Sequence, residues 1–254
     1  MLLTVSIGNT RIEVGALAGE DILFAEYLNT EMKSTTFEYA SKIRSVLAFH
    51  GYESASIEGA IISSVVPPLT HVMRNAVDRA FGVSALVVGP GLKNGLRIRI
   101  DDPKQLGANM AVTAVGALAS YKPPLIIIDM GSATTITALS ADGSFLGGSI
   151  MPGLQLSLNA LVAGTSQLPR IDASSPKQAI GRNTVDSMKS GVIYGEAARF
   201  DGLIDRFEKE MGTSARVIAT GISAREIIPH CRHRIDYDPS LRIRGLADIY
   251  RRNV

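Results

Sequence analysis

The chain has 254 residues, of which 46% are hydrophobic, so it can bury a sizeable core without disulfides or a structural metal. Its formal net charge of +2 lacks the strong basic balance of a nucleic-acid-binding protein, so we expect no nucleic-acid partner. The single cysteine, Cys231, can form no intrachain disulfide, which fits a reducing cytoplasm. No apolar run approaches the ~20 residues of a membrane span, so we expect a cytoplasmic protein with no membrane partner.

The first predicted elements are two strands around a glycine turn, followed by a helix. Residues 2–17 read as a short apolar strand, a turn at Gly8 and a second strand, and a further turn and strand follow. Residues 36–49 predict a helix, with Ser34 and Thr35 as candidate caps. Its apolar residues recur on one face: Phe37, Ala40, Ile43, Val46 and Leu47.

This pattern recurs in the second half of the chain. Residues 125–140 repeat the strand, glycine turn and strand of the first hairpin, with Asp129 at the position of Ser6. Residues 59–65 and 215–221 are a second matching pair, each a buried strand that ends in small residues. Two apolar strands could match by chance, but the order of the elements matches too, which favours an internal duplication.

Two lobes of α/β class with a cleft between them follow from the duplication. Adjacent prolines within residues 121–124 favour a boundary there, so we predict one lobe over 1–121 and another over 122–254. Residues 184–211 predict a long helix and residues 240–252 a closing helix, both assigned to the second lobe. The long helix has more apolar positions than one face requires, so we expect it to form a dimer interface, unless it is buried within its own lobe.

The glycine turns have the composition of a phosphate-binding loop. A turn between two strands exposes backbone N–H groups, and Ser or Thr hydroxyls add donors for phosphate oxygens. An Asp at the end of the first strand can hold a metal that bridges those phosphates. Residues 129–135 contain all these groups, whereas the first copy has Gly8, Asn9 and Thr10 but Ser6 in place of the Asp. Each loop alone also fits an ordinary hairpin turn.

Short motifs rich in Gly, Pro, Ser, Thr and Asp recur along the chain, at residues 7–10, 63–67, 89–91, 102–103, 107–108, 129–135, 146–148, 152–153, 168–169 and 219–221. The series resembles the type III pantothenate kinases of the acetate kinase/Hsp70/actin superfamily. The resemblance implies a duplicated actin-like (ribonuclease H-like) ATPase fold and ATP-dependent phosphorylation of pantothenate, the first step towards coenzyme A. It also implies ATP with Mg²⁺, a monovalent cation (K⁺ or NH₄⁺) and a homodimer.

The resemblance assigns roles to individual positions. Asn109 stands where the general base is expected, and Asp129 where the monovalent cation is held. The nucleotide and phosphate positions are Ser6, Gly8, Asn9, Thr10, Arg11, Gly131, Ser132, Thr134, Thr220 and Gly221. The substrate positions are Ile100, Gly107, Ala108, Met110, Thr165 and Thr184.

Several of these positions depart from the family pattern in ways that matter for chemistry. Ser6 replaces an acid, Asn109 replaces the Asp that acts as base, and Met110 replaces an Arg. A positioned base contributes ~10²–10⁴ in rate, and an Arg would pair with an anionic substrate. Ile100 replaces an expected Tyr, and Ile222 replaces a Gly where adenine needs a close backbone approach.

We therefore expect phosphoryl transfer to be lost or strongly impaired, because it depends on positioning and charge stabilisation. Two alternatives remain open. One is an active kinase with an altered acceptor that recruits Asp101, Asp102 or Glu196 as base. The other is a non-catalytic protein that binds a ligand or a partner.

Arginines gather near the C-terminus: Arg232, Arg234, Arg242, Arg244, Arg251 and Arg252. Acidic residues are interleaved with them, and few aromatic residues accompany them. We interpret this stretch as a solvated face and not as a nucleic-acid surface.

Overall fold

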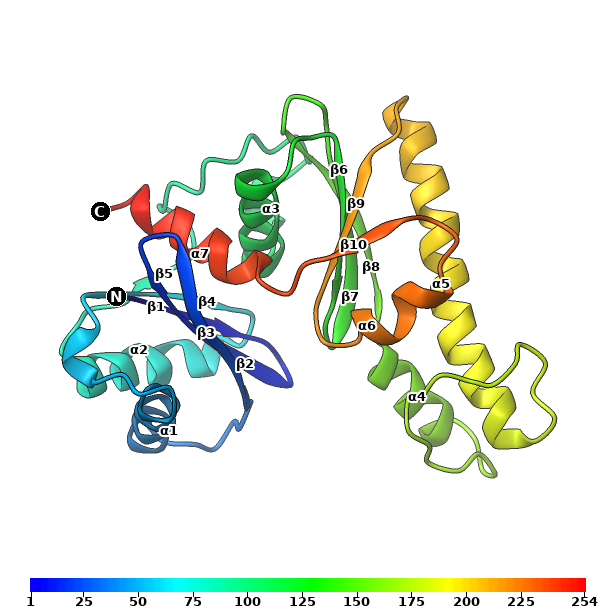
Figure 1. Ribbon diagram of the computed structural model, residues 1–254, viewed down its shortest axis with the longest axis horizontal. Coiled ribbons are helices and arrows are strands. Elements are labelled where there is room, and N and C mark those ends of the chain that lie inside the picture. The colour runs from blue at the N-terminus through cyan, green and yellow to red at the C-terminus, as the bar shows by residue number, and fades with distance from the viewer. The chain divides into compact units, whose positions relative to one another are not determined.

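The computed structural model describes all residues, 1–254, in two compact units. Unit 1 contains Met1–Leu96, Asp101–Ser120 and Ser240–Val254. Unit 2 contains Arg97–Ile100 and Tyr121–Pro239. Each unit has its own five-stranded sheet with helices packed on it (Figure 1).

Unit 1 is built on a sheet with the strand order β3-β2-β1-β4-β5. β1 and β2 form an antiparallel hairpin, and β4 runs parallel to β1. The strands are β1 (Leu2–Ile7), β2 (Arg11–Ala18), β3 (Asp21–Asn29), β4 (Gly59–Ser64) and β5 (Leu86–Val87). The helices are α1 (Thr36–Phe49), α2 (Pro67–Phe81), α3 (Ala108–Ser120) and α7 (Leu241–Arg251), with short 3₁₀ turns at Ser54–Ser56 and Pro103–Gln105.

Unit 2 has the order β10-β9-β6-β7-β8, which repeats that of unit 1 strand for strand. The duplication expected from the sequence is therefore confirmed, with β6 equivalent to β1 and β9 to β4. The strands are β6 (Leu125–Met130), β7 (Ala133–Leu139), β8 (Phe145–Pro152), β9 (Arg216–Thr220) and β10 (Ile235–Tyr237). The helices are α4 (Leu154–Ala163), α5 (Thr184–Met211) and α6 (Ala224–Ile227), with a 3₁₀ turn at Ile228–His230.

Helix α1 begins where the sequence predicts, at Thr35. The Thr35 hydroxyl accepts a hydrogen bond from the Glu38 N–H at 3.3 Å, and the Glu38 carboxylate accepts one from the Thr35 N–H at 2.6 Å. This is a reciprocal capping box. The predicted buried face was wrong at Phe37, which is 62% exposed, while Tyr39 is fully buried. The face starts two residues later because Tyr39 lies one turn before Ile43 and so shares its side of the helix.

The two faces of the first sheet carry different residues. Alternate apolar side chains such as Leu3, Val5 and Ile62 pack into the core that includes residues of α1 and α2. The opposite face is covered by α3 and α7, whose apolar residues join Ile61 in a second cluster. A strand exposes successive side chains on opposite faces, so the polar residues between these apolar positions lie on the α3 and α7 side.

Two segments depart from the predicted boundary at residue 121. The closing helix α7 packs in unit 1, because Gly116 of α3 and Gly245 of α7 allow the two backbones to touch. A Cβ on Gly116 would lie 1.9 Å from the Leu241 carbonyl oxygen. Residues 97–100 join unit 2, where the Arg99 N–H donates to the Phe145 carbonyl at 2.8 Å.

None of the helices is both long enough and apolar enough to cross a lipid bilayer.

Candidate functional site

Each unit contains a row of three polar residues, one on each of three neighbouring strands, that lie side by side across the sheet. In unit 1 Ser6 of β1 lies between Ser63 of β4 and Glu13 of β2; we call these three the first row. In unit 2 Asp129 of β6 lies between Thr220 of β9 and Thr135 of β7; these are the second row. The rows occupy equivalent positions of the duplicated sheets, just before the glycine turns.

Asn109 is brought into contact with the first row by α3. The Ser63 hydroxyl donates to the Asn109 side-chain oxygen at 2.8 Å. The Asn109 carbonyl accepts a hydrogen bond from Thr113 at 2.8 Å, which fixes the first turn of the helix. Ser6 and Ser63 are both buried. The side chain at the predicted position of the base is thus held by the hydroxyl of Ser63, and a carboxamide there cannot accept a proton at neutral pH.

The carboxylate of the first row belongs to Glu13, and it is already paired. Glu13 is 3% exposed. Tyr27 donates to one of its oxygens at 3.1 Å, and the Arg242 guanidinium lies 3.4 Å from the other. Glu13 was not predicted as a site residue, and the interpretation of Arg242 as part of a solvated face was wrong, because its side chain is 15% exposed and pairs with Glu13. Glu13 could have been noticed as an acid directly opposite Ser6 in the hairpin. Its partner Arg242 could not be found from the sequence because it lies 229 positions away.

The first glycine turn is a rigid loop with a free tip. The Gly8 N–H donates to the Arg11 carbonyl at 2.9 Å, and Thr30 bonds the carbonyls of Gly8 and Thr10 at 2.7 and 3.0 Å. Asn9, at the exposed tip, makes no hydrogen bond through its N–H or its side chain. The loop therefore offers donors to a ligand from a fixed backbone, as a phosphate-binding turn requires.

The second glycine turn is one residue shorter and packs closely on the start of α4. The Gly131 N–H donates to the Ala133 carbonyl at 3.2 Å, and the Gly153 N–H donates to the Ser132 carbonyl at 3.1 Å. A Cβ at Gly153 would lie 2.2 Å from the Gly131 oxygen, so only glycine fits.

The register of the second hairpin separates the two threonines of the turn. Thr134 is opposite Met130, on the face that packs into the apolar core of unit 2, and is 1% exposed. Thr135 is opposite Asp129. Since side chains alternate between faces, Thr135 and not the predicted Thr134 shares the face of Asp129.

Gly221 follows the second row at the end of β9. Its φ is +94°, and a Cβ there would lie 2.3 Å from the Met130 carbonyl oxygen. The backbone of β9 can pass this close to β6 only because the residue is glycine. Ile222 comes next and is 38% exposed.

The predicted substrate positions fall into separate places. Gly107, Ala108 and Met110 surround Asn109 at the start of α3 in unit 1. Ile100 is in unit 2, with its side chain 3.7 Å from the Cβ position of Gly147.

The two predicted substrate threonines are not drawn into the second row. Thr165 is exposed after α4, and its hydroxyl donates to the carbonyl of Leu161 in that helix at 2.8 Å. Thr184 is the exposed first residue of α5, next to the cap residue Asn183.

Two of the three acids considered as alternative bases already have partners. Asp102 caps a 3₁₀ turn and accepts from the Lys104 N–H at 3.0 Å. Glu196 is buried in α5 of unit 2 and pairs with Arg199. Asp101 is exposed. None of the three therefore stands out as a replacement for a carboxylate at position 109.

The chain has clear relatives among known proteins. Residues 2–206 match the family model of type III pantothenate kinase. The chain is 40% identical over 253 residues to the type III pantothenate kinase of Pelobacter propionicus, covering 100% of both chains. It is 39% identical over 253 residues to that of Exiguobacterium sp., covering 100% of this chain and 99% of the relative.

The fold has solved counterparts as well. The activator of the 2-hydroxyisocaproyl-CoA dehydratase from Clostridium difficile with bound ADPNP gives a TM-score of 0.58 at 15% identity, covering 98% of this chain and 93% of that one. The expected actin-like ATPase fold is thus confirmed. With a family model matched over most of its length and full-length relatives near 40% identity, the chain belongs to the type III pantothenate kinase family.

Proposed function

We propose that this protein is a nucleotide-binding member of the family in which phosphoryl transfer to pantothenate is lost or strongly impaired. The observation that carries the proposal is the hydrogen bond of 2.8 Å from Ser63 to Asn109. Ser63 lies beside Ser6, the central residue of the first row. The side chain at the position of the base can orient a hydroxyl but cannot take its proton.

The first row also fits a divalent cation poorly. Magnesium is usually bound through one or two carboxylates together with phosphate oxygens. The first row has Ser6 in the central position, and its only carboxylate, Glu13, is buried against Tyr27 and Arg242. The pair carries no net charge, so the row does not attract a divalent ion as a free acid would.

The second row retains the groups that a nucleotide phosphate and a monovalent cation need. A carboxylate between two hydroxyls, at Asp129, Thr135 and Thr220, provides oxygen ligands suited to K⁺ or NH₄⁺. The adjacent glycine turn is fixed by Gly153 and keeps Ser132 beside it. The actin-like fold of a protein solved with bound ADPNP supports ATP as the nucleotide.

The positions expected to bind pantothenate have also changed in a way that disfavours catalysis. Met110 follows Asn109 and provides no cation for a carboxylate. Ile100 provides no hydroxyl. Binding of pantothenate should therefore be weaker than in a family member that keeps the pattern, in addition to the loss of the base. ATP and pantothenate meet in the cytoplasm, which is where we place this protein.

We further propose a homodimer formed through unit 2. Large apolar side chains are exposed on β8, on α4 and before α5: Ile150, Leu156, Leu161 and Ile180. Ile150 is 72% exposed and Ile180 81%. Exposed apolar residues that recur on one unit are typical of a protein–protein interface.

Calorimetric titration with ATP tests the binding half of the proposal. We expect heat of binding in the presence of K⁺, and a loss of affinity in Asp129→Ala. Asp186→Ala, which removes an acid at the start of α5 in the same unit, is the matched control and should bind as the wild type does. ATP binding that Asp129→Ala leaves unchanged would show that the second row is only a structural element.

An assay that couples ADP formation to pantothenate addition tests the catalytic half. We expect no turnover above background in the wild type, and a gain in the combined Ser6→Asp, Asn109→Asp, Met110→Arg variant that exceeds any single reversion. Groups that act as one catalytic unit are non-additive. A single reversion that restores as much activity as all three would contradict the assignment.

A further inference from the structure

The first turn of α3 presents hydrogen-bond donors next to the first row. The N–H groups at the start of a helix have no partners within the helix, and they carry a partial positive charge that favours anions. Gly107, the residue before α3, has no side chain that could cap them. A Cβ on Gly107 would meet no atom within 4 Å, so there is open space beside the start of the helix.

The orientation of the Asn109 side chain adds two donors to this turn. Ser63 is fully buried, and the one hydrogen bond of its side chain goes to the Asn109 oxygen. If the amide were reversed, that buried hydroxyl would have no acceptor, which folded proteins avoid. The oxygen of Asn109 therefore faces Ser63. Its NH₂ group makes no hydrogen bond and belongs to a half-buried residue that a ligand can reach.

Ser6 provides a buried polar group without a partner. It is 4% exposed, and its hydroxyl makes no hydrogen bond. Ser6 is directly beside Ser63 in the register of β1 and β4, so both side chains are on the sheet face that α3 and α7 cover. Buried hydroxyls are nearly always hydrogen-bonded. A buried hydroxyl without a partner, beside free amide donors, therefore points to a ligand.

The charges of the first row do not oppose an anion. Glu13 is the only carboxylate of the row, and the Arg242 guanidinium lies 3.4 Å from it. The two charges cancel to a large extent because each is close to the other. An anion at the start of α3 would therefore meet hydrogen-bond donors and no uncompensated acid of the row.

We propose that the start of α3 binds the phosphate group of a phosphate monoester and not the hydroxyl of an alcohol. A phosphate dianion only accepts hydrogen bonds, which suits the NH₂ group of Asn109, the hydroxyl of Ser6 and the N–H groups of the helix. An alcohol must also donate, and the Asn109 oxygen is already occupied by Ser63.

The proposal deepens the proposed function and rests on it, because it requires that no base stands at position 109. With a carboxylate at that position, the site would accept the proton of an alcohol and repel a phosphate. With a carboxamide, the preference is reversed. The site then recognises the product of the family reaction, the phosphate monoester of pantothenate, in preference to pantothenate itself.

Calorimetry in the absence of nucleotide compares pantothenate with its phosphate monoester, two ligands that differ only at the reacting hydroxyl. We expect the monoester to bind at least about tenfold more tightly to the wild type, because hydrogen bonds to a charged group are the stronger ones. Asn109→Asp keeps the size of the side chain but replaces its donors by a negative charge. It should weaken binding of the monoester at least about tenfold.

A second variant and a matched control accompany this exchange. Ser6→Ala removes one donor and should weaken binding of the monoester about threefold or more. Asn75→Asp makes the same exchange as Asn109→Asp at an exposed position of α2, the helix on the other face of the sheet. It should leave the affinity unchanged. Circular dichroism checks that each variant folds, and Ser6→Ala decides the question if Asn109→Asp does not.

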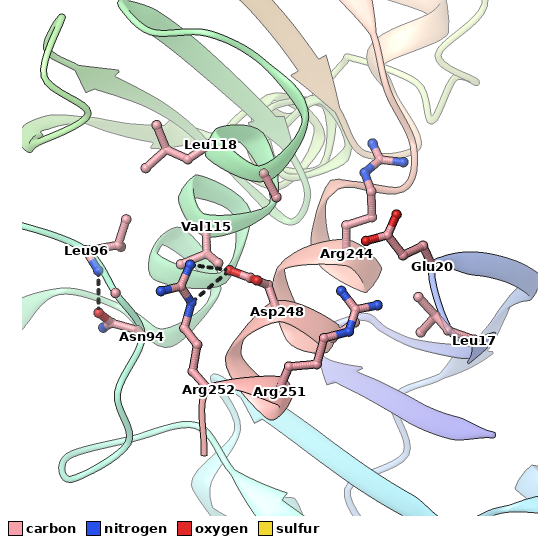
Figure 2. Close-up of a pocket in the computed structure, with 13 residues that line it drawn as sticks. Leu17, Glu20, Asn94, Leu96, Val115, Leu118, Arg244, Asp248, Arg251 and Arg252 are labelled. Carbon is pink, nitrogen blue, oxygen red and sulfur yellow. Dashed lines mark hydrogen bonds and ion pairs between the residues drawn. The ribbon is translucent and has the colours of Figure 1, made fainter. Parts of the chain in front are cut away.

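A cavity between α3 and α7 provides a further control (Figure 2). It lies further along α3, where Val115 and Leu118 line it, and Arg251 of α7 contributes a cation to it. A phosphate held at the start of α3 does not depend on this cation. Arg251→Gln should therefore leave the affinity for the monoester unchanged.

Three results would overturn the proposal. The first is a wild type that does not bind the monoester, or binds it no more tightly than pantothenate. The second is a folded Asn109→Asp, or in its absence Ser6→Ala, that binds the monoester as the wild type does. The third is a loss in Arg251→Gln as large as in Asn109→Asp, which would place the phosphate in the cavity. None of these contradicts the proposed function, which is tested separately by ATP binding and by turnover of pantothenate.

Discussion

The buried pair between Glu13 and Arg242 gives the most specific stability prediction. Glu13→Gln keeps the size of the side chain but removes its charge. Arg242 is 15% exposed and Glu13 is 3% exposed, so the guanidinium would remain largely buried after losing the charge of Glu13. Because Arg242 is the second residue of α7, the loss acts directly on the docking of that helix to β2.

The size of the effect follows from the geometry. Removing one partner of a buried ion pair costs about 3–5 kcal/mol. The contact of 3.4 Å is longer than a strong charge-assisted hydrogen bond, and Tyr27 can still donate to a glutamine oxygen. We therefore expect the lower end, about 3 kcal/mol. Tyr27→Phe, which removes one hydrogen bond only, should cost about 1 kcal/mol.

Urea unfolding followed by circular dichroism measures these free energies. The double variant Glu13→Leu, Arg242→Met should recover most of the loss, because an apolar pair of similar volume replaces a buried ion pair at little cost. A loss below about 1 kcal/mol for Glu13→Gln, or single losses that simply add in the double variant, would refute the reasoning.

Three further predictions concern the cap, the pH dependence and the dimer. Thr35→Ala should lower the free energy of unfolding by about 1 kcal/mol, because it removes the hydroxyl that accepts a hydrogen bond from the Glu38 N–H. Hydrogen bonds from Ser140 and Ser144 lower the pKa of Asp142 to about 2. The stabilisation of the fold by ionised Asp142 is therefore complete above its pKa of ~3.9 in the unfolded chain and is lost as the pH falls towards 2. Urea unfolding of Asp142→Asn should therefore show a smaller loss of stability between about pH 4 and pH 2 than the wild type. An equal loss in the two proteins would contradict this. Light scattering should give a dimer for the wild type and a species near 27.0 kDa for Ile150→Asp, and a monomeric wild type would refute the interface.

Local patterns were enough to predict the duplication and the helices α1, α5 and α7, but not α2 or α3. The equivalence of Ser6 and Asp129 follows from the spacing of glycine turns, and α5 covers the residues that its periodicity indicates. The cap at Thr35 was also predicted, since it depends only on residues within one turn. Such features are encoded over short distances and need no tertiary information.

The features that were missed depend on pairing over long distances or on register. The sequence could not assign α7 to unit 1, because an apolar helix face does not indicate which sheet it covers. Thr135, and not Thr134, shares a face with Asp129 because the length of the second turn fixes the register of the hairpin. Arg242 could not be matched to Glu13 until α7 was placed on β2.

The measurement that tests the central claim most directly is steady-state phosphorylation of pantothenate by the wild-type protein at saturating ATP, Mg²⁺ and NH₄⁺, run on a sample whose ATP binding has been measured by calorimetry. Without a base at position 109, we expect a turnover at least ~10² below the ~1–100 per second typical of kinases, while ATP still binds. A turnover within that ordinary range would contradict the account, because Asn109 held by Ser63 cannot serve as the base.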